Sequence, residues 1–508
     1  MLNIIDRFLN NITMYRLVLY YLVALFVVAL VLGFFDVLPY TPLALCYSVL
    51  VMIAVSWLTN WLFARVFKAE TNIESVYITA FLLVLIMAPI TPSQIDQFPA
   101  LAWIAVWAMA SKYMFAIMKK HLFNPAAFAV ALSAVFLGQS ANWWVGGNIP
   151  MLAFVVLGGL LVVRKMRRAD LVMSFFVGAL VSVSLSVLPD GDPLVSIKMA
   201  LLHAPVFFFA FAMLTEPLTT PPTRLLRVAY GLFVGLLFAP SIHIGSVYST
   251  PELALLVGNI FSYAVSPKEK YRLRLKEIIT LATDTFDYVF TPDRPLNFRP
   301  GQYIELTLAH KHPDARGNRR YLTIASSPTE LEMHFGVKFY PASSSFKKAF
   351  AALPTGGELM AGQLAGDFTL PENPKQKLAF IAGGIGVTPF RSMVKYLLDT
   401  KDNRTVTLFY SNKTIDEIAY KDIFDQAEKE LGMKTVYTLS EKEKAPPDWK
   451  GYTGFLNKEM LIAETPDYLE RTFYLSGPHG MVAAFEKTLH EMGVQQKHIH
   501  IDFFPGYA

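Results

Sequence analysis

A glycine-rich segment near the C-terminus carries the clearest chemistry in the sequence. Residues 382–390 read AGGIGVTPF, an apolar run that ends in glycines and is followed by a threonine and a proline. Glycine lets a backbone approach a phosphate closely, threonine can cap a helix, and proline suits a helix's first turn. The segment therefore predicts a strand, a phosphate-binding loop and a helix. The residues of this loop are Gly383, Gly384, Gly386, Thr388 and Pro389.

The segments around this loop predict two soluble domains. Residues 268–372 contain short alternating stretches separated by Gly and Pro, which is typical of a small antiparallel barrel. Residues 376–508 alternate strand and helix patterns, which predicts a parallel α/β layer. In the barrel, Arg320 could neutralise a phosphate, and the serines of SSSFKKAF (343–350) precede a helix whose first N–H groups favour an anion.

A barrel followed by a glycine-loop α/β layer resembles the ferredoxin–NADP⁺ reductase superfamily, which includes cytochrome b5 reductase and oxygenase reductases. The resemblance implies an FAD domain, an NAD(P) domain and hydride transfer between their cofactors. The superfamily's flavin signature, Arg-x-aromatic-Ser/Thr, reads RYLT here, and it stays open whether the leucine or the tyrosine covers the flavin ring. The residues implied at the FAD are Arg320, Tyr321, Leu322, Thr323, Ser344, Ser345 and Phe346.

The same resemblance implies the residues near the nicotinamide. YLSGPHGM (474–481) is similar to the superfamily's Cys-Gly-Pro-x-x-Met, with Ser476 in place of the cysteine and Gly477 and Pro478 after it. The expected catalytic residues are Ser476, beside the nicotinamide, and Thr323, at the flavin's polar edge. Among the C-terminal aromatic residues, Phe504 is the expected cover of the ring.

The loop after the second α/β strand meets the adenosine ribose in this superfamily. Here it contains Ser411 and Lys413, in the sequence FYSNKTIDEI. This loop is more like those of NADH-dependent cytochrome b5 reductases than like arginine-rich NADPH loops. We therefore expect NADH, and NADPH stays open because Lys413 could contact a 2′-phosphate.

The first half of the chain is a membrane domain, residues 1–265. The whole chain is 54% hydrophobic, which is too apolar for a protein without membrane segments. About 20 apolar residues cross a bilayer, and ten windows of about that length occur. The windows lie at 17–36, 42–64, 75–90, 100–118, 124–138, 149–163, 170–188, 197–214, 226–240 and 252–265.

The basic residues predict the orientation of these spans. Lys and Arg gather before the first window and after every second one, whereas the loops between contain none. Because cytoplasmic loops carry the positive charge, both termini and the reductase domains should be cytoplasmic, in a bacterial-type inner membrane. The loops without Lys or Arg are 36–41, 90–99, 139–148, 189–195 and 241–251.

Two polar motifs interrupt the apolar half. KHLFNPAAF (120–128) places Asn124 and a proline at the start of the fifth window, and AMLTEPLTTPPTR (212–224) follows the eighth. Their order, with the segments RRADLVMSFFVGAL and LALLVGNIFSY, resembles the membrane family formed by RnfD of Rnf complexes and NqrB of the sodium-pumping NADH:quinone reductase. The resemblance implies ten spans, flavin binding and further membrane subunits. The residues expected at a membrane acceptor site are Asn124, Thr215, Glu216 and Thr219.

One departure from this family concerns its covalent flavin. The family carries FMN on the threonine of a Ser-Gly-Ala-Thr-type sequence, in the segment after the FNPA helix. Here that segment is GQSANWWVGGNIP (138–150), which contains no threonine. We therefore expect no covalent FMN, and non-covalent FMN or riboflavin stays open.

Histidine and cysteine counts limit other redox groups. The apolar half contains three histidines, His121, His203 and His243, whereas a two-haem ferric reductase needs two facing pairs. The single Cys46 excludes a cysteine-ligated iron–sulfur cluster within the chain. We expect no metal site, and the net charge of +5 gives no reason to expect a nucleic-acid partner.

The expected function is a membrane-bound flavin oxidoreductase. NAD(P)H would reduce FAD in the cytoplasmic domains, and electrons would pass to a quinone, a membrane flavin or a partner protein. Two alternatives stay open: the ten-span domain is only an anchor, or it is a haem-containing transmembrane carrier.

Overall fold

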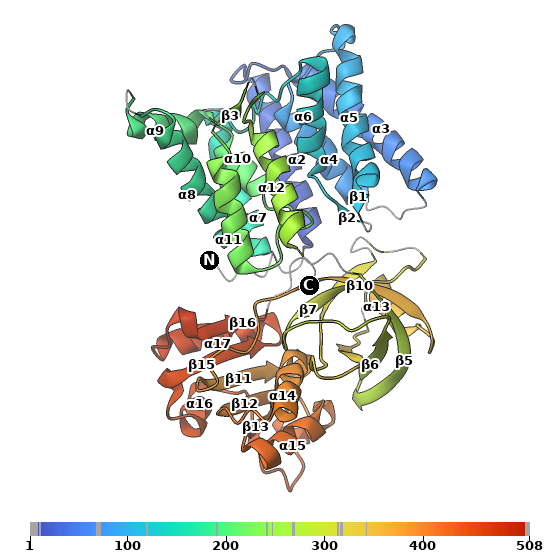
Figure 1. The fold of residues 1–508 in the computed structure, drawn as a ribbon, viewed down its shortest axis with the longest axis vertical. Coiled ribbons are helices and arrows are strands. Elements are labelled where there is room, and N and C mark those ends of the chain that lie inside the picture. Colours follow the sequence, from blue (N-terminus) through green and yellow to red (C-terminus); the bar gives the residue numbers. More distant parts are fainter. Residues whose placement is uncertain are drawn as a thin grey trace. The chain divides into compact units, whose positions relative to one another are not determined.

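The computed structural model of the chain divides into two compact units, Met1–Ser266 and Pro267–Phe504. The first unit is helical and the second contains two six-stranded sheets (Figure 1). The structure describes residue 9 and residues 12–67, 73–117, 120–188, 191–239, 242–245, 247–266, 270–311, 314, 318–341 and 343–502.

Every apolar window predicted in the first unit contains a helix. Several helices begin at a capping side chain followed by proline: Thr41, Asn124 and Thr250 each accept a hydrogen bond from the backbone N–H three residues later. The helices are α2 (Met14–Phe34), α3 (Pro42–Val66), α4 (Ile73–Ile86), α5 (Phe98–Met114), α6 (Pro125–Leu137), α7 (Ile149–Met166), α8 (Ala169–Leu185), α9 (Pro193–His203), α10 (Val206–Phe208) with the π-helix η2 (Phe209–Met213), α11 (Arg224–Leu236) and α12 (Pro251–Val265).

Few of these helices have the length of a full span. Among the described residues, α2, α3 and α7 are long and apolar enough to cross a membrane, and a fourth span results if α9 and α10–η2, bent by 65°, count as one. Helices α4, α6, α8 and α12 are apolar but shorter. The structure therefore shows three or four membrane-length segments, fewer than the ten that hydropathy predicts, because an apolar window says nothing about where its helix ends.

Small residues bring neighbouring helices of this unit together. A Cβ on Gly235 of α11 would lie 2.3 Å from the carbonyl oxygen of Phe175 in α8, and one on Gly178 would lie 2.5 Å from that of Leu232. Such close backbone approach is the usual way in which helices pack in a membrane.

The first sheet of the second unit is antiparallel, as the sequence predicts. Its strands run in the order β8-β7-β10-β5-β6-β9 around a core that includes Phe290, Phe335 and Phe346. The elements are β5 (Tyr271–Ala282), β6 (Thr285–Pro292), β7 (Tyr303–Thr307), β8 (Arg319–Thr323), β9 (Met333–Lys338), α13 (Ser345–Ala351) and β10 (Glu358–Ala365).

The second sheet is parallel and is covered on both faces. Phe380 packs with helices α14 and α15, whereas its neighbour Ile381 packs with α16 and α17, because successive strand residues point to opposite faces. The strand order is β14-β13-β12-β11-β15-β16. The elements are β11 (Lys377–Gly383), α14 (Thr388–Thr400), β12 (Val406–Asn412), α15 (Lys421–Leu431), β13 (Lys434–Leu439), β14 (Tyr452–Thr453), α16 (Lys458–Glu464), β15 (Arg471–Ser476), α17 (His479–Glu491) and β16 (Ile499–Ile501).

Helix α14 ties the two sheets of this unit together. Arg391 is buried and donates to the carbonyl of Ala325 at 3.1 Å and to the carboxylate of Glu330 at 2.9 Å. Ser392 donates to the carbonyl of Ser326 at 2.6 Å. The helix that follows the glycine loop is thereby fixed to the segment that follows strand β8.

Candidate functional sites

The glycine loop and the Ser476 loop meet at the carboxyl edge of the parallel sheet. Strands β11 and β15 are paired, with Ala382 opposite Ser476. A Cβ on Gly386 would lie 2.5 Å from the Cα of Gly477, and Gly477 itself has a φ of 151° that favours glycine. The two predicted motifs therefore form one surface, built from backbone that a side chain would disrupt.

The helix after this loop begins as the sequence predicts, with one difference. Pro389 lies in the first turn of α14, where its missing N–H costs no hydrogen bond. The threonine, expected to cap the helix, is already its first residue, and the hydroxyl of Thr388 donates to the carbonyl of Ile385 at 3.3 Å. The cap prediction for Thr388 is therefore wrong, because an intervening short helix, η3 (Gly384–Val387), moves the start of α14.

Ser476 is buried and has a carboxylate partner. Its hydroxyl donates to Asp502 at 3.0 Å, and the backbone of Asp502 is held by the carbonyl of Leu475 at 2.9 Å. Burial raises the pKa of Asp502 to about 7, although the hydrogen bond from Ser476 lowers it. The expected nicotinamide side of the site thus contains a carboxyl group that titrates near neutral pH.

The residues expected near the adenosine lie at the same edge of the sheet. Ser411 is opposite Gly383 across the paired strands β11 and β12, and the exposed Lys413 follows the end of β12. The carboxyl ends of parallel strands are where open α/β sheets bind nucleotides. The structure thus brings Gly383, Ser411 and Ser476 to one edge.

Strand β8 separates the two aromatic-slot alternatives onto opposite faces. Leu322 packs against the barrel core, and its partner in β7 is the fully buried Ile304. Tyr321 and Thr323 alternate with it and face the other side, where Tyr321 meets Tyr303 edge-on at 5.4 Å. This arrangement favours Tyr321 as the side chain beside Thr323.

The groups expected to hold phosphates converge on a carboxylate of the chain itself. Ser344 caps α13 by accepting from the N–H of Lys347, and the N–H of Ser345 donates to Asp314 at 3.0 Å. The guanidinium of Arg320 lies 3.8 Å from the same carboxylate and 5.3 Å from the ring centre of Phe346. Asp314 stands where a phosphate is expected, so this donor set fits an anion such as the FAD pyrophosphate. Phe504 lies outside the described residues.

In the helical unit, the two polar motifs form one cluster around Glu216. The carboxylate accepts from the side chain of Asn124 at 2.9 Å and from Thr219 at 3.2 Å, and it pairs with His121 at 3.0 Å. The Lys112 ammonium also acts on it electrostatically. Three of the four residues expected at an acceptor site are therefore brought together.

The fourth residue, Thr215, does not join this cluster through its hydroxyl. Thr215 is buried, and its hydroxyl donates to the carbonyl of Phe211 at 2.7 Å. Other contacts extend the cluster instead: the N–H of Asn124 donates to Asn259 at 2.8 Å, and Asn259 donates to Tyr230 at 3.1 Å. The cluster thus joins α6, α11, α12 and the loop after η2.

Sequence reasoning missed several of these partners. It considered His121 only as a haem ligand, yet His121 pairs with Glu216, 95 residues away. The three histidines also do not face one another, since His121 is in β2 (Lys120–His121), His203 ends α9 and His243 is in β3 (His243–Ile244). Asp314 and Asp502 carry no local motif, and only the pairing of distant segments reveals them.

Two family models match the chain. Residues 380–487 match the oxidoreductase NAD-binding domain, and residues 131–269 match the NQR2, RnfD, RnfE family. The chain thus carries an NAD-binding oxidoreductase module of the ferredoxin reductase type and an NQR2/RnfD/RnfE membrane region, as the resemblances predict.

Individual relatives agree with this description. The chain is 28% identical to the glycine betaine monooxygenase reductase subunit of Chromohalobacter salexigens, over 46% of this chain and 64% of that protein. It is 28% identical to NADH-cytochrome b5 reductase 1 of Ajellomyces capsulatus, over 49% of this chain and 84% of that protein. It is 26% identical to the F-type subunit of the Na⁺-translocating NADH-quinone reductase of Psychrobacter cryohalolentis, over 44% of this chain and 52% of that protein. The chain therefore spans less than two thirds of the first and the third of these relatives.

The contact between the two glycine loops gives a first prediction. In Gly386→Ala the new methyl group would collide with the backbone of Gly477, so we expect the KM for NADH to rise at least about tenfold while the FAD content stays unchanged. NADH–ferricyanide kinetics and the flavin spectrum of purified protein measure both quantities. Gly432→Ala is the control, because Gly432 also has a positive φ but its Cβ would meet no atom within 4 Å. Equal KM values in the two variants would contradict the assignment.

The raised pKa of Asp502 gives a second prediction. Between the ordinary carboxyl pKa of 3.8 and about 7, the folded chain keeps a proton that the unfolded chain loses, so this group's stabilising contribution falls as the pH rises through that window. In Asp502→Asn the contribution is independent of pH. We expect the melting temperature of the variant to rise relative to that of the unmodified protein between pH 5 and pH 8. A constant difference would show that Asp502 does not titrate there.

Proposed function

We propose that the chain is a membrane-bound NADH oxidoreductase that passes electrons to an acceptor at its helical unit. One observation carries this proposal: a single chain joins an NAD-binding oxidoreductase module to an NQR2/RnfD/RnfE region. One relative is the F-type subunit of an NADH-quinone reductase, and the membrane region resembles the NqrB protein of that type of enzyme. Quinone, a membrane flavin or a partner subunit would receive the electrons.

FAD is the cofactor proposed for the barrel. Arg320, Ser344 and Ser345 would hold its pyrophosphate at the position of Asp314, and Phe346 would support Arg320. Tyr321 would lie against the ring and Thr323 at its polar edge. When bound, FAD accepts a hydride from NADH and releases electrons to one-electron or two-electron acceptors.

The parallel sheet would hold NADH and orient it. Gly383, Gly384 and Gly386 would let the backbone approach the phosphates, with Thr388 and Pro389 at the start of the following helix. Ser411 and Lys413 would meet the adenosine ribose, and Ser476, Gly477 and Pro478 would position the nicotinamide. Because hydride transfer needs close and aligned reacting atoms, orientation is the main contribution of these residues. NADPH is the less favoured cofactor, with Lys413 as its phosphate contact.

The helical unit is that of an integral membrane protein, and we propose a particular topology for it. The shorter helices would complete ten spans, with both termini and the reductase unit on the cytoplasmic side. The alternation of loops with and without basic residues supports this orientation. The Glu216 cluster would then lie at the cytoplasmic end of the helices, beside Lys112 and the loop after η2.

We propose the Glu216 cluster as the site where the membrane acceptor is reduced. Polar groups within membrane helices are costly unless they serve a function, and this cluster gathers a carboxylate, an imidazole, an amide and a hydroxyl. The amide of Asn124 and the imidazole of His121 are groups that could bind the carbonyl oxygens of a quinone or flavin ring.

The proposal predicts a selective loss in Glu216→Gln. We expect reduction of decylubiquinone by NADH to fall about tenfold, because the charge that orients His121 and Asn124 is removed. Reduction of ferricyanide by NADH should change less than about twofold, since that activity needs only the reductase unit. Both rates are measured on purified full-length protein in detergent.

Asp170→Asn is the matched control. Asp170 is another partly buried carboxylate of the helical unit, paired with Arg227 at 2.8 Å, and it lies in no proposed site. We expect both activities of this variant to match those of the unmodified protein. If Glu216→Gln also leaves both rates unchanged, the cluster is a structural tie and the anchor interpretation of the helical unit gains support.

A further inference from the structure

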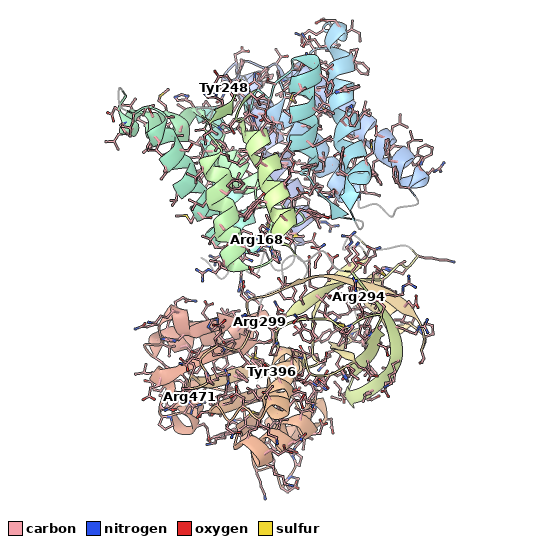
Figure 2. The ribbon with its side chains drawn as sticks, viewed as in Figure 1. Arg168, Tyr248, Arg294, Arg299, Tyr396 and Arg471 are labelled. Carbon is pink, nitrogen blue, oxygen red and sulfur yellow. The ribbon has the colours of Figure 1, made fainter. Side chains whose placement is uncertain are left out.

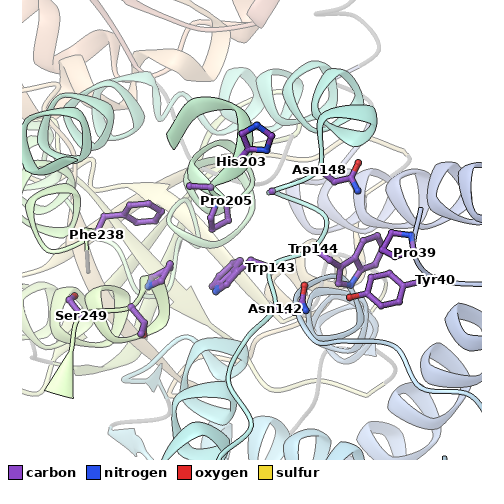
Figure 3. Close-up of a pocket in the computed structure, with 14 residues that line it drawn as sticks. Pro39, Tyr40, Asn142, Trp143, Trp144, Asn148, His203, Pro205, Phe238 and Ser249 are labelled. Atoms are coloured by element: carbon purple, nitrogen blue, oxygen red, sulfur yellow. The ribbon is translucent and has the colours of Figure 1, made fainter. Parts of the chain in front are cut away.

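A cavity of 510 Å³ opens among the loops at one end of the helical unit (Figure 3). Its wall is mainly aromatic, with Tyr40, Trp143, Trp144 and Phe238 contributed by three different loop regions. The cavity is within the size range of small-molecule sites, which bind flat aromatic ligands between such side chains. None of the described residues that line this cavity belongs to the Glu216 cluster or to the reductase site.

The two tryptophans are held rigidly. The indole N–H of Trp144 donates to the carbonyl oxygens of Val84 and Met87 at 2.9 and 3.1 Å, and that of Trp143 donates to Glu252 at 3.2 Å. Tyr40 meets Trp144 edge-on at 5.5 Å. Rotamers fixed in this way lose little freedom when a ligand binds, so the wall is preorganised.

The loop that carries both tryptophans is pressed against a break between two helices. A Cβ on Gly147 would lie 2.7 Å from the carbonyl oxygen of His203, and one on Gly146 would lie 2.8 Å from Pro205. This break, between α9 and α10, is the 65° bend of the helical unit. Glycine at both positions therefore shapes one side of the cavity.

The remaining lining residues are polar but uncharged at neutral pH, apart from the imidazole of His203. Asn142 and Asn148 place carboxamides at the wall, Ser249 and Thr250 place hydroxyls there, and Asn142 and His203 are exposed at the rim. Among the described residues that line the cavity there is no Lys, Arg, Asp or Glu, and no Leu, Ile, Val or Met. The site thus suits a flat ring with a neutral polar edge.

The cavity lies at the end of the helical unit opposite the Glu216 cluster. Figure 1 shows β3 at one end of this unit and β1 and β2 at the other, and Figure 2 shows Tyr248 at the cavity end and Arg168 at the cluster end. Helix α6 runs from Asn124 in the cluster towards the tryptophan loop, and its 13 residues rise about 20 Å. The loops of the cavity are those without Lys or Arg, which the charge pattern places outside the cytoplasm.

We propose that this cavity binds the isoalloxazine ring of an uncharged flavin, riboflavin, without a covalent bond. The ring would stack on Tyr40 and the tryptophans, and its imide edge would face the carboxamides. Binding follows from the cavity alone, whereas a role of this flavin in electron transfer rests on the proposed function.

The chemistry of the wall favours a flavin over a quinone. A carboxamide both donates and accepts, which matches the alternating C=O and N–H groups of an imide edge, whereas an oxidised quinone offers only acceptors. A membrane quinone also needs aliphatic walls for its tail, and the described lining has none. The absence of cationic lining among these residues leaves a flavin phosphate without a partner, so FMN should bind no more tightly than riboflavin.

The test is a titration of riboflavin into FAD-loaded, full-length protein in detergent, without NADH. Quenching of riboflavin fluorescence gives the Kd. We expect Tyr40→Leu to raise the Kd about tenfold through lost stacking, and Ala204→Trp, which fills the cavity, to abolish binding. Tyr248→Leu is the control, because Tyr248 is 57% exposed at the same end but does not line the cavity.

The outcomes separate this inference from the proposed function. Saturable binding that Tyr40→Leu weakens and Tyr248→Leu preserves supports the site, even in a preparation that fails to oxidise NADH. The proposal is overturned if FAD-loaded protein shows no saturable binding, or if Tyr40→Leu and Ala204→Trp leave the Kd unchanged. It is also overturned if decylubiquinone, but not riboflavin, quenches tryptophan fluorescence in a manner that depends on Tyr40.

Discussion

The contact between Gly386 and Gly477 constrains the whole reductase unit. At this point two loops from neighbouring parallel strands touch through their backbones, and neither position has room for a side chain. The contact sets the distance between the loop expected at the phosphates and the loop expected at the nicotinamide. The buried Arg391 then fixes the following helix to the barrel, so the positions of both predicted cofactors depend on one arrangement of strands β11 and β15.

The parts that the sequence predicts well are those in which adjacent residues determine the structure. The glycine loop, its proline and the RYLT strand are local patterns, and the structure places each on the expected kind of element. The orientation of Leu322 could not be predicted in this way, because it depends on the pairing of β8 with β7. Asp502 was missed for a similar reason: it comes near Ser476 only because β16 pairs with β15.

The helical unit shows a different limit of sequence reasoning. Hydropathy located every helix, but it overestimated their lengths, since capping residues, prolines and the bend near Pro205 end or break the helices inside apolar windows. These interruptions are also where the polar groups gather. Asn124 caps α6 and binds Glu216 with the same side chain, so one residue both begins a helix and builds the cluster.

Asp314 has a consequence for how the protein matures. Its carboxylate lies between the guanidinium of Arg320 and the N–H of Ser345, where the proposed cofactor would place a phosphate. A newly made chain therefore has its own counter-ion for this positive site, and the barrel need not wait for a nucleotide before it folds. Loading would then be an exchange of one anion for another, with its rate set by the departure of an internal carboxylate.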